Sequence, residues 1–190
     1  MSAILANMFI IIALGNVGQK YEKTRHNTGW IIVDEIFKNE AWEYNKYFNA
    51  EVVEDHHSNL IVKPHTMMNC SGDAVKIALQ QYPEATPDNI IVLHDDVDIA
   101  LGSFKIAYDR GDGNHRGVAS ITEALGTSAY IRIRIGIGHH GMIPMDKYVL
   151  MNMSEDDLAI LNTIASRIGE ALNILVIDGK EKAMNIYNTN

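Results

Sequence analysis

The stretch that decides the fold is Met8-Phe9-Ile10-Ile11-Ile12-Ala13-Leu14-Gly15-Asn16. A continuous apolar run that ends in Gly-Asn is typical of a strand buried on both faces of a sheet. The run is too short to span a bilayer, which needs about 20 residues. No lysine or arginine precedes it, so it does not resemble a signal peptide. We therefore expect a sheet with helices on both faces.

Helical and strand patterns alternate along the rest of the chain. Further strands are predicted at Phe48–Glu54, Asn59–Lys63, Asn89–Leu93, Ser103–Tyr108 and Ile131–Ile137. Helices are predicted to begin near Thr28, Ser71, Val118 and Ser154 and after Gly179. Thr28 and Ser71 are expected to act as N-caps, and Ser154 with Asp157 to form a capping box. This order predicts an α/β fold.

The bulk properties predict one globular domain over residues 1–190. The chain is 47% hydrophobic, which is enough for a large core, and it contains no repeat, low-complexity run or Pro/Gly linker. No further segment is expected to span a membrane. A single cysteine, Cys70, excludes an internal disulfide and favours a reducing, cytoplasmic setting.

The charge balance does not favour a nucleic-acid partner, because the formal net charge is −8. Cations exceed acidic residues between positions 105 and 147. They are Lys105, Arg110, Arg116, Arg132, Arg134 and Lys147. The excess is small, so charge alone favours an ordinary solvated surface over a nucleic-acid footprint.

Four polar clusters lie at predicted strand ends or in adjacent loops. They are Asn16 with His26 and Asn27, His65–Ser71, His94–Asp98, and Asp112–Arg116. Ligands of α/β sheets usually bind at the carboxyl ends of strands. The convergence of these clusters is the main indication of a functional site.

A histidine and a carboxylate among them suit hydrolysis. His26 can take a proton from water near neutral pH, and Asp95 can hold its tautomer and stabilise the imidazolium. If the strand continues this far, Asp95 and Asp96 point to opposite faces, and only one is expected to face the cleft. Asp98 is the better candidate for a turn carboxylate. An ordinary loop histidine remains an alternative for His26.

The remaining candidates each have a structural alternative. Asn69 offers an uncharged donor for a developing oxyanion, or a helix start. Asn16 can pair with a peptide backbone, or form a simple turn with Gly15. Arg132 and Arg134 share one strand face and can grip a phosphate, or form salt bridges.

Other chemistries lack their motifs. The chain has no Walker loop, dinucleotide fingerprint or nucleophile elbow, and nothing marks Cys70 as a reactive thiol. Histidines and aspartates such as His94, Asp98 and His139 match no zinc spacing. We therefore expect neither a metal nor another cofactor.

Four motifs resemble those of bacterial-type peptidyl-tRNA hydrolases, in that family's order and over most of the chain. The first comprises Leu14-Gly15-Asn16-Val17-Gly18, Tyr21 and Thr24-Arg25-His26-Asn27-Thr28-Gly29-Trp30. The others are Lys63-Pro64-His65-Thr66-Met67-Met68-Asn69-Cys70-Ser71-Gly72, His94-Asp95-Asp96-Val97-Asp98 with Gly102, and Arg132-Ile133-Arg134-Ile135-Gly136-Ile137-Gly138.

The resemblance implies one α/β globule with a mixed sheet flanked by helices, and no required metal. It implies that His26 is a general base paired with Asp95, and that Asn69 supports the catalytic step. Substrate-binding residues implied by it are Asn16, Tyr21, Met68, His115 and Arg134. Asn16 and Asn69 are expected to contact the peptide main chain, and Arg134 a tRNA phosphate.

Two positions depart from the family pattern. The family's Gly-Gly-His-Asn-Gly is Gly113-Asn114-His115-Arg116-Gly117 here, so a neutral amide is replaced by a cation. The family also has a lysine that helps to hold the tRNA phosphate. That position is Ala107 here, while Lys105 lies two residues earlier and is expected on the same strand face. Arg116 is expected to reach the tRNA backbone or to pair with Asp112.

The leading hypothesis is a metal-independent hydrolase that cleaves the ester between a peptide and tRNA, using water activated by His26. It predicts a cytoplasmic monomer with peptidyl-tRNA as partner and no membrane association. The alternative is an RNA-binding homologue of the same fold with impaired catalysis, which the change at Arg116 favours. A third possibility, a hydrolase of a smaller ester or amide, fits the net charge better than a tRNA substrate does.

Overall fold

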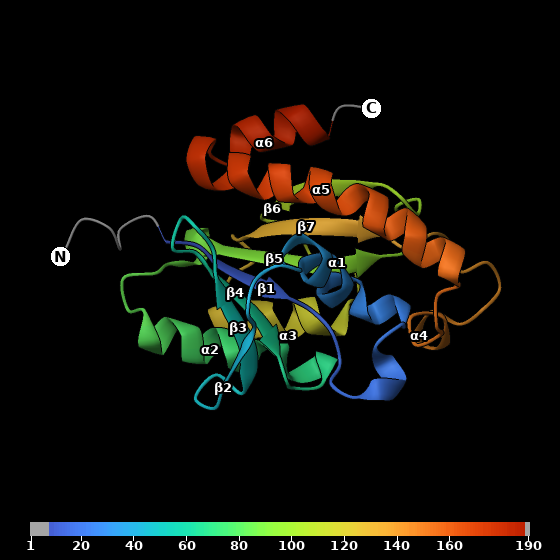
Figure 1. Ribbon diagram of the computed structural model, residues 1–190, viewed down its shortest axis with the longest axis horizontal. Coiled ribbons are helices and arrows are strands. Elements are labelled where there is room, and N and C mark those ends of the chain that lie inside the picture. Colours follow the sequence, from blue (N-terminus) through green and yellow to red (C-terminus); the bar gives the residue numbers. More distant parts are fainter. Residues whose placement is uncertain (1–7, 189–190) are drawn as a thin grey trace.

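The initial apolar run forms β1 (Ile10–Ala13), the middle strand of a seven-stranded sheet in the computed structural model, which describes residues 8–188 (Figure 1). The sheet order is β2-β3-β4-β1-β5-β7-β6. The other strands are β2 (Glu43–Asn45), β3 (Ala50–Glu54), β4 (Leu60–Pro64), β5 (Ile90–Asp96), β6 (Phe104–Tyr108) and β7 (Ile131–Gly136). Strands β4, β1, β5 and β7 are parallel, and β2, β3 and β6 run antiparallel to their neighbours. The sheet is therefore mixed, as expected.

Helices cover both faces of this sheet, which confirms the α/β prediction (Figure 1). On one face lie α1 (Thr28–Ile36), α5 (Glu155–Asp178) and α6 (Lys180–Tyr187). On the other lie α2 (Ser71–Gln81) and α3 (Arg116–Leu125). A short helix, α4 (Met145–Tyr148), precedes α5. All seven strands belong to one sheet, so residues 8–188 form one domain.

Strand β1 shows why the initial run is apolar throughout. Its side chains alternate between the two faces, as strand geometry requires. Ile11 and Ala13 belong to the core under α1 and α5, whereas Ile10 and Ile12 belong to the core under α2 and α3. All four are buried, because β1 has a parallel neighbour on each side and helices above and below.

Strand β5 is longer than predicted and carries site residues within the sheet. The sequence prediction ends it at Leu93, but it continues to Asp96. Pairing with β7 extends it, since His94, Asp95 and Asp96 lie opposite Arg134, Ile135 and Gly136. The polar run at the end of β5 is therefore held by backbone hydrogen bonds, which fixes where Asp95 projects.

Two of the predicted N-caps are wrong. The hydroxyls of Thr28 and Ser71 donate backwards, to the carbonyls of Arg25 at 2.7 Å and Met68 at 2.8 Å. Each helix directly follows a turn of 3-10 helix, so these residues already lie inside a continuous helical path. The capping box of Ser154 and Asp157 at the start of α5 is confirmed.

Helix α5 is long and apolar enough to cross a membrane by length and composition, a property that the sequence interpretation misses. Its apolar residues have a partner within the domain, because seven of its side chains are buried in the core against the sheet, α1 and α6. They are Leu161, Ile164, Ala165, Ile168, Ala171, Leu172 and Leu175. The packing of a core helix therefore accounts for this composition.

The outer edge of β6 is closed by one side chain from the end of α6. The amide of Asn188 donates to the carbonyl of Ile106 at 2.8 Å and accepts the N–H of the same residue at 2.8 Å. The amide thus forms the pair of hydrogen bonds that a neighbouring strand would form at this position.

Helices α2 and α3 approach each other closely at Gly72. A Cβ atom there would lie 2.2 Å from the backbone oxygen of Ser120. We predict that Gly72→Ala lowers the free energy of unfolding by about 1–3 kcal/mol, because two backbones must separate. Urea denaturation of the purified variant measures this change.

Gly169→Ala is the matched control. Gly169 also lies in a helix, but a Cβ added there would meet only side-chain atoms of Ile36, at 3.7 Å and beyond. Alanine is favoured over glycine within helices by up to about 1 kcal/mol, so this variant should be as stable as the wild type or more so. Equal stability of Gly72→Ala and wild type would contradict the packing argument.

Candidate active site

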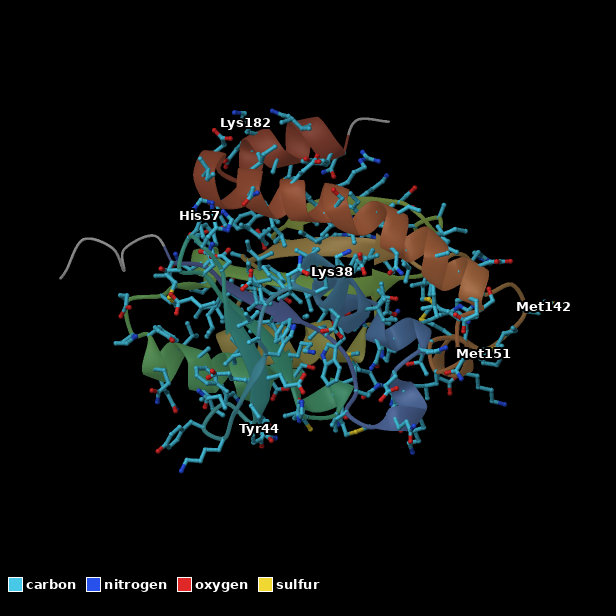
Figure 2. All side chains as sticks on the ribbon, in the orientation of Figure 1. Lys38, Tyr44, His57, Met142, Met151 and Lys182 are labelled. Carbon is cyan, nitrogen blue, oxygen red and sulfur yellow. The ribbon has the colours of Figure 1, made fainter. Side chains whose placement is uncertain are left out.

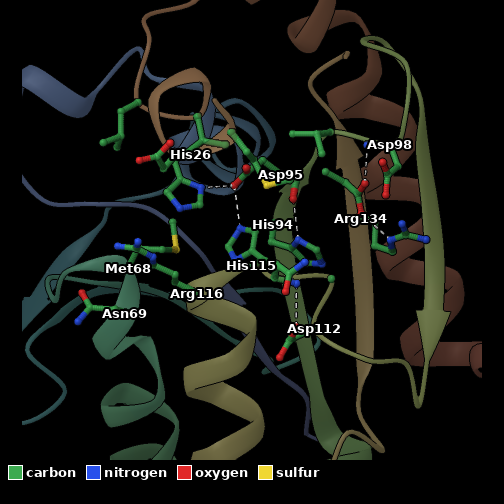
Figure 3. A pocket seen from close by; sticks show the side chains of 18 of the residues that line it. His26, Met68, Asn69, His94, Asp95, Asp98, Asp112, His115, Arg116 and Arg134 are labelled. Carbon is green, nitrogen blue, oxygen red and sulfur yellow. Dashed lines mark hydrogen bonds and ion pairs between the residues drawn. The ribbon is translucent and has the colours of Figure 1, made fainter. Parts of the chain in front are cut away.

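A cavity of about 500 Å³ opens at the carboxyl ends of β1, β5 and β7 (Figure 3). This is the edge at which α/β sheets usually bind ligands. The structure brings nine of the ten predicted site residues to its wall. They are Asn16, Tyr21, His26, Met68, Asn69, Asp95, His115, Arg116 and Arg134. Lys105 is the exception and lies outside the wall.

Two backbone hydrogen bonds hold the segment that carries His26. It lies in a short 3-10 helix, Arg25–Asn27, which leads directly into α1. Its N–H donates to the carbonyl of Val149 at 2.8 Å, and the N–H of Arg25 donates to Met151 at 3.2 Å. The segment before α5 therefore fixes the position of His26.

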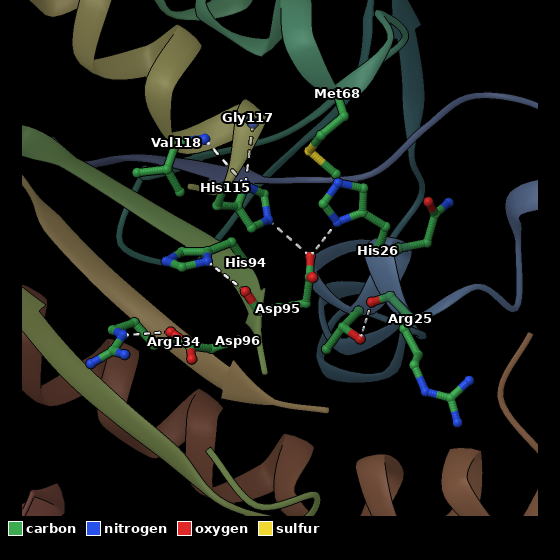
Figure 4. Close-up of polar contacts among 12 residues, drawn as sticks. Arg25, His26, Met68, His94, Asp95, Asp96, His115, Gly117, Val118 and Arg134 are labelled. Carbon is green, nitrogen blue, oxygen red and sulfur yellow. Dashed lines mark hydrogen bonds and ion pairs between the residues drawn. The ribbon is translucent and has the colours of Figure 1, made fainter. Parts of the chain in front are cut away.

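The ring of His26 contacts the buried carboxylate of Asp95 (Figure 4). Nδ1 of His26 lies 2.8 Å from Oδ1 of Asp95. Because a carboxylate only accepts hydrogen bonds, Nδ1 donates this bond, and in the neutral ring the lone pair is on Nε2. Among residues 8–188 no partner occupies Nε2, so it is available as a base in the cavity.

A second histidine shares the same carboxylate oxygen. Nε2 of His115 lies 2.9 Å from Oδ1 of Asp95. Nδ1 of His115 accepts the backbone N–H groups of Gly117 and Val118 at 3.2 and 3.3 Å, so His115 is the N-cap of α3 (Figure 4). These two donors leave the ring proton on Nε2, which donates to Asp95.

Asp95 is therefore held as an anion inside the protein. Burial by itself raises the pKa of this carboxyl group, but the neighbouring rings of His26 and His115 and their hydrogen bonds outweigh burial and hold the pKa well below its ordinary value of 3.8. Burial also lowers the pKa of the neighbouring residue His94 well below 6.5. His94 donates from Nδ1 to the backbone oxygen of Asp95 at 2.8 Å.

His26, Asp95 and His115 place three potential metal-binding atoms within 4.8 Å of one another. Their geometry is that of a hydrogen-bonded triad. A metal on Nε2 of His115 would require the proton on Nδ1, where two backbone N–H groups already point. These three residues therefore do not form a ready metal site.

Asn16 and Met68 form a fixed corner of the cavity. Oδ1 of Asn16 accepts the backbone N–H of Met68 at 2.8 Å. Asn27 holds the backbone of Asn16 from the other side, with its side chain accepting the N–H and donating to the carbonyl. The remaining side-chain donors of Asn16 are its amide hydrogens, which suits binding to a carbonyl group.

Asn69 and Arg116 line the cavity with exposed side chains, and Tyr21 with a partly buried one. No hydrogen bond or ion pair joins Asn69 or Arg116 to another side chain within residues 8–188, so the expected pairing of Arg116 with Asp112 is wrong. Asp112 instead accepts the N–H of Asn114 at 2.8 Å. The side chains of Asn69 and Arg116 are therefore available to a ligand.

The two arginines of β7 differ in role. Arg134 donates from Nε to Asp96 at 2.7 Å and lies directly opposite Lys105 of β6, on the same face. Arg132 is buried, and its guanidinium donates to the backbone oxygens of Arg110 and Gly111. Arg132 therefore supports the loop before α3, and the sequence interpretation of it as a phosphate ligand is wrong.

Asp95 and Asp96 do form hydrogen bonds in different directions, but both line the cavity, so the expectation that only one faces it is wrong. Asp96 also accepts the N–H of Asp98 at 2.9 Å. The carboxylate that stabilises this turn therefore belongs to Asp96, and the prediction that it belongs to Asp98 is wrong.

Sequence reasoning misses three features of the site. The bond between His115 and Asp95 joins residues with no shared motif, and the support from Arg132 runs to backbone atoms. Apolar residues before α5 also line the cavity, and the sequence contains no signal for this role. They are Met145, Val149 and Leu150. The role of Asn27 in holding Asn16 has one signal in the sequence. Asn27 is next to His26 and follows Asn16 by eleven residues, so these three polar residues form a cluster.

Comparisons with known proteins show which family the chain resembles. The family model described as "Peptidyl-tRNA hydrolase" matches residues 10–190. The chain is 40% identical to the peptidyl-tRNA hydrolase of Thermodesulfovibrio yellowstonii over 185 residues, which covers 95% of this chain and 99% of that protein. It is 40% identical to that of Thermotoga maritima over 183 residues, covering 95% and 97%.

A solved structure is also similar. The crystal structure of peptidyl-tRNA hydrolase from Acinetobacter baumannii superposes with a TM-score of 0.84 at 26% sequence identity. The match covers 97% of this chain and 96% of that chain. The similarity therefore includes the whole sheet and the helices on both faces.

The low pKa of Asp95 predicts how stability depends on pH. In the unfolded chain the group takes up a proton near pH 3.8, whereas in the folded protein it stays ionised to lower pH. Its contribution to stability is therefore present above pH 3.8 and is lost as the pH falls through this value and below. We predict that the free energy of unfolding falls more steeply from about pH 5 to about pH 3 in wild type than in Asp95→Asn.

Urea denaturation at a series of pH values measures both slopes. Asparagine has the shape of aspartate but does not titrate, so its variant isolates the contribution of this proton. Identical slopes would show that Asp95 has the same proton affinity in the folded and unfolded chain.

Proposed function

Because the chain belongs to the peptidyl-tRNA hydrolase family and hydrolyses peptidyl-tRNA, we propose that His26 activates the attacking water. The observation that carries this proposal is the hydrogen bond from Nδ1 of His26 to the buried Asp95, which places the lone pair of the neutral ring on Nε2, at the cavity. A free lone pair on a fixed imidazole is what a general base requires.

In the proposed reaction, Nε2 of His26 takes a proton from water as the water oxygen bonds to the ester carbonyl carbon. The resulting tetrahedral intermediate collapses by breaking the bond to the ribose oxygen. The proton on Nε2 then passes to that oxygen, which yields free peptide and tRNA. Asp95 stabilises the imidazolium during this cycle and holds the ring orientation.

The neutral amides of the cavity are suited to the acyl part of the substrate. We assign Asn69 to the developing oxyanion, because its exposed side chain can donate without adding charge. Asn16, fixed by Met68 and Asn27, has the geometry to hold the peptide main chain. Tyr21 and Met68 add apolar surface beside it, and His115 keeps the oxygen of Asp95 in place.

The cationic pair of β6 and β7 is suited to the tRNA. Lys105 and Arg134 lie opposite each other on one sheet face. Arg134 gives only Nε to Asp96, so its terminal nitrogens remain for a phosphate. Lys105 is exposed and has no ion pair within the described residues. We propose that these two side chains bind the phosphate backbone near the acceptor end.

Two alternatives predicted from the sequence receive less support. A homologue with impaired catalysis would have no need for the His26–Asp95 pair, which is intact. A hydrolase of a smaller ester would not require the family-wide similarity over residues 10–190. We also propose that the protein acts in the cytoplasm, where ribosomes make its substrate, and as a monomer, since residues of one chain line the cavity.

We predict that His26→Ala lowers kcat for peptidyl-tRNA hydrolysis by at least about a hundredfold, since general bases typically contribute about 10²–10⁴ in rate. Release of free peptide from a labelled peptidyl-tRNA measures the rate. Circular dichroism should show an unchanged fold.

His57→Ala is the control, because this histidine is exposed (Figure 2) and does not line the cavity. It should hydrolyse the substrate at the wild-type rate. If His26→Ala were as fast as His57→Ala, His26 would have no part in the reaction.

Lys105→Gln is predicted to weaken the salt dependence of hydrolysis. Loss of one phosphate contact reduces the slope of log(kcat/KM) against log salt by about 0.7–0.9. Lys76→Gln removes the same charge from an exposed position on α2 outside the cavity and should keep the wild-type slope. Equal slopes for the two variants would exclude Lys105 from tRNA binding.

A further inference from the structure

Arg116 is a cation of the cavity with no charged partner among residues 8–188. It is the first residue of α3, and its exposed side chain lines the cavity. The aspartates of the wall are engaged elsewhere or lie apart from it. Asp95 binds two histidines, Asp96 binds Arg134, and Asp112 holds the N–H of Asn114. The positive charge of Arg116 is therefore available to a ligand.

The position of Arg116 is on the side of the cavity assigned to the peptide. The start of α3 packs on Met68, since a Cβ on Gly117 would lie 2.5 Å from the sulfur of Met68. Figure 3 shows Arg116, Met68, Asn69 and His26 on one side of the cavity and Arg134 with Asp98 on the other. Arg116 is thus separated from the cations proposed to bind tRNA.

Several uncharged side chains line the cavity together with Arg116. Asn16, Asn69, Met67 and Met68 contribute amides and apolar groups. One acidic side chain, Asp146 on α4, also lines the cavity but forms no ion pair with Arg116. A guanidinium without a charged partner discriminates between ligands by charge, and it binds a carboxylate through two parallel hydrogen bonds.

We propose that Arg116 makes this hydrolase selective for peptides with a carboxylate side chain in one of the two residues nearest the ester. This inference rests on the proposed function, because the orientation of the substrate follows from the assignment of His26 and Asn69. The contact forms at a partly open wall, so its effect is moderate. We expect kcat/KM to favour a glutamate over a glutamine in such a peptide by about fivefold.

The experiment uses N-acetyl-dipeptidyl-tRNAs that share one tRNA body. Glutamate, glutamine or lysine is placed at either peptide position, and kcat/KM is measured for each substrate. Wild type should prefer glutamate at one or both positions. Arg116→Gln should abolish the preference, Arg116→Lys should keep part of it, and Arg116→Glu should reverse it in favour of lysine.

Lys76→Gln serves again as the control, since it removes one positive charge outside the cavity and should leave the ratio of glutamate to glutamine substrates unchanged. Equal kcat/KM of wild type for glutamate and glutamine at both positions would overturn the proposal. So would an Arg116→Gln variant that slows all substrates alike with a weaker salt dependence, because the guanidinium would then bind a tRNA phosphate.

The glutamine substrates separate this inference from the proposed function. They contain no charge for Arg116 to select, so their hydrolysis by wild type and its loss in His26→Ala depend on the catalytic pair alone. Failure of the charge preference with normal turnover of the glutamine substrates would reject the role of Arg116 and leave that of His26 unaffected.

Discussion

The site depends on one ionised carboxylate oxygen buried at the end of a strand. An unpaired charge in such a place is strongly destabilising, and Oδ1 of Asp95 avoids this by accepting from His26 and His115. These contacts join β5, the 3-10 helix before α1 and the first turn of α3. The ring of His115 also accepts backbone N–H groups as the cap of α3, and the backbone N–H of His26 donates to the carbonyl of Val149. The charge that orients the base therefore also determines how these segments meet.

Much of this arrangement could be predicted because it follows local rules. The apolar run of β1 required burial on both faces, and Asp95 follows a buried strand at the edge where ligands bind. What could not be predicted depends on contacts across the fold. The roles of His115 and Arg132 are set by segments distant in sequence. Thr28 and Ser71 do not act as N-caps, because 3-10 turns precede both helices.

The acidic net charge and a polyanionic substrate are compatible because the charges are separated in space. The cations of β6 and β7 lie on one sheet face next to the cavity. Asp96 accepts a hydrogen bond from only one nitrogen of Arg134. On the opposite side of the cavity lie Asn69 and Arg116, and Arg116 has no ion pair within residues 8–188. The sign of the whole chain therefore says little about the field that a substrate meets.

The two hydrogen bonds between Asn188 and Ile106 connect residues 82 positions apart. During synthesis β6 can join the sheet only by pairing with β7, which ends at Gly136 and is therefore made before residue 188. Until then Ile106 presents an unpaired N–H and C=O at an open strand edge, where another chain can add. The final turn of α6 thus ends a period in which the nascent protein is vulnerable to association with other chains.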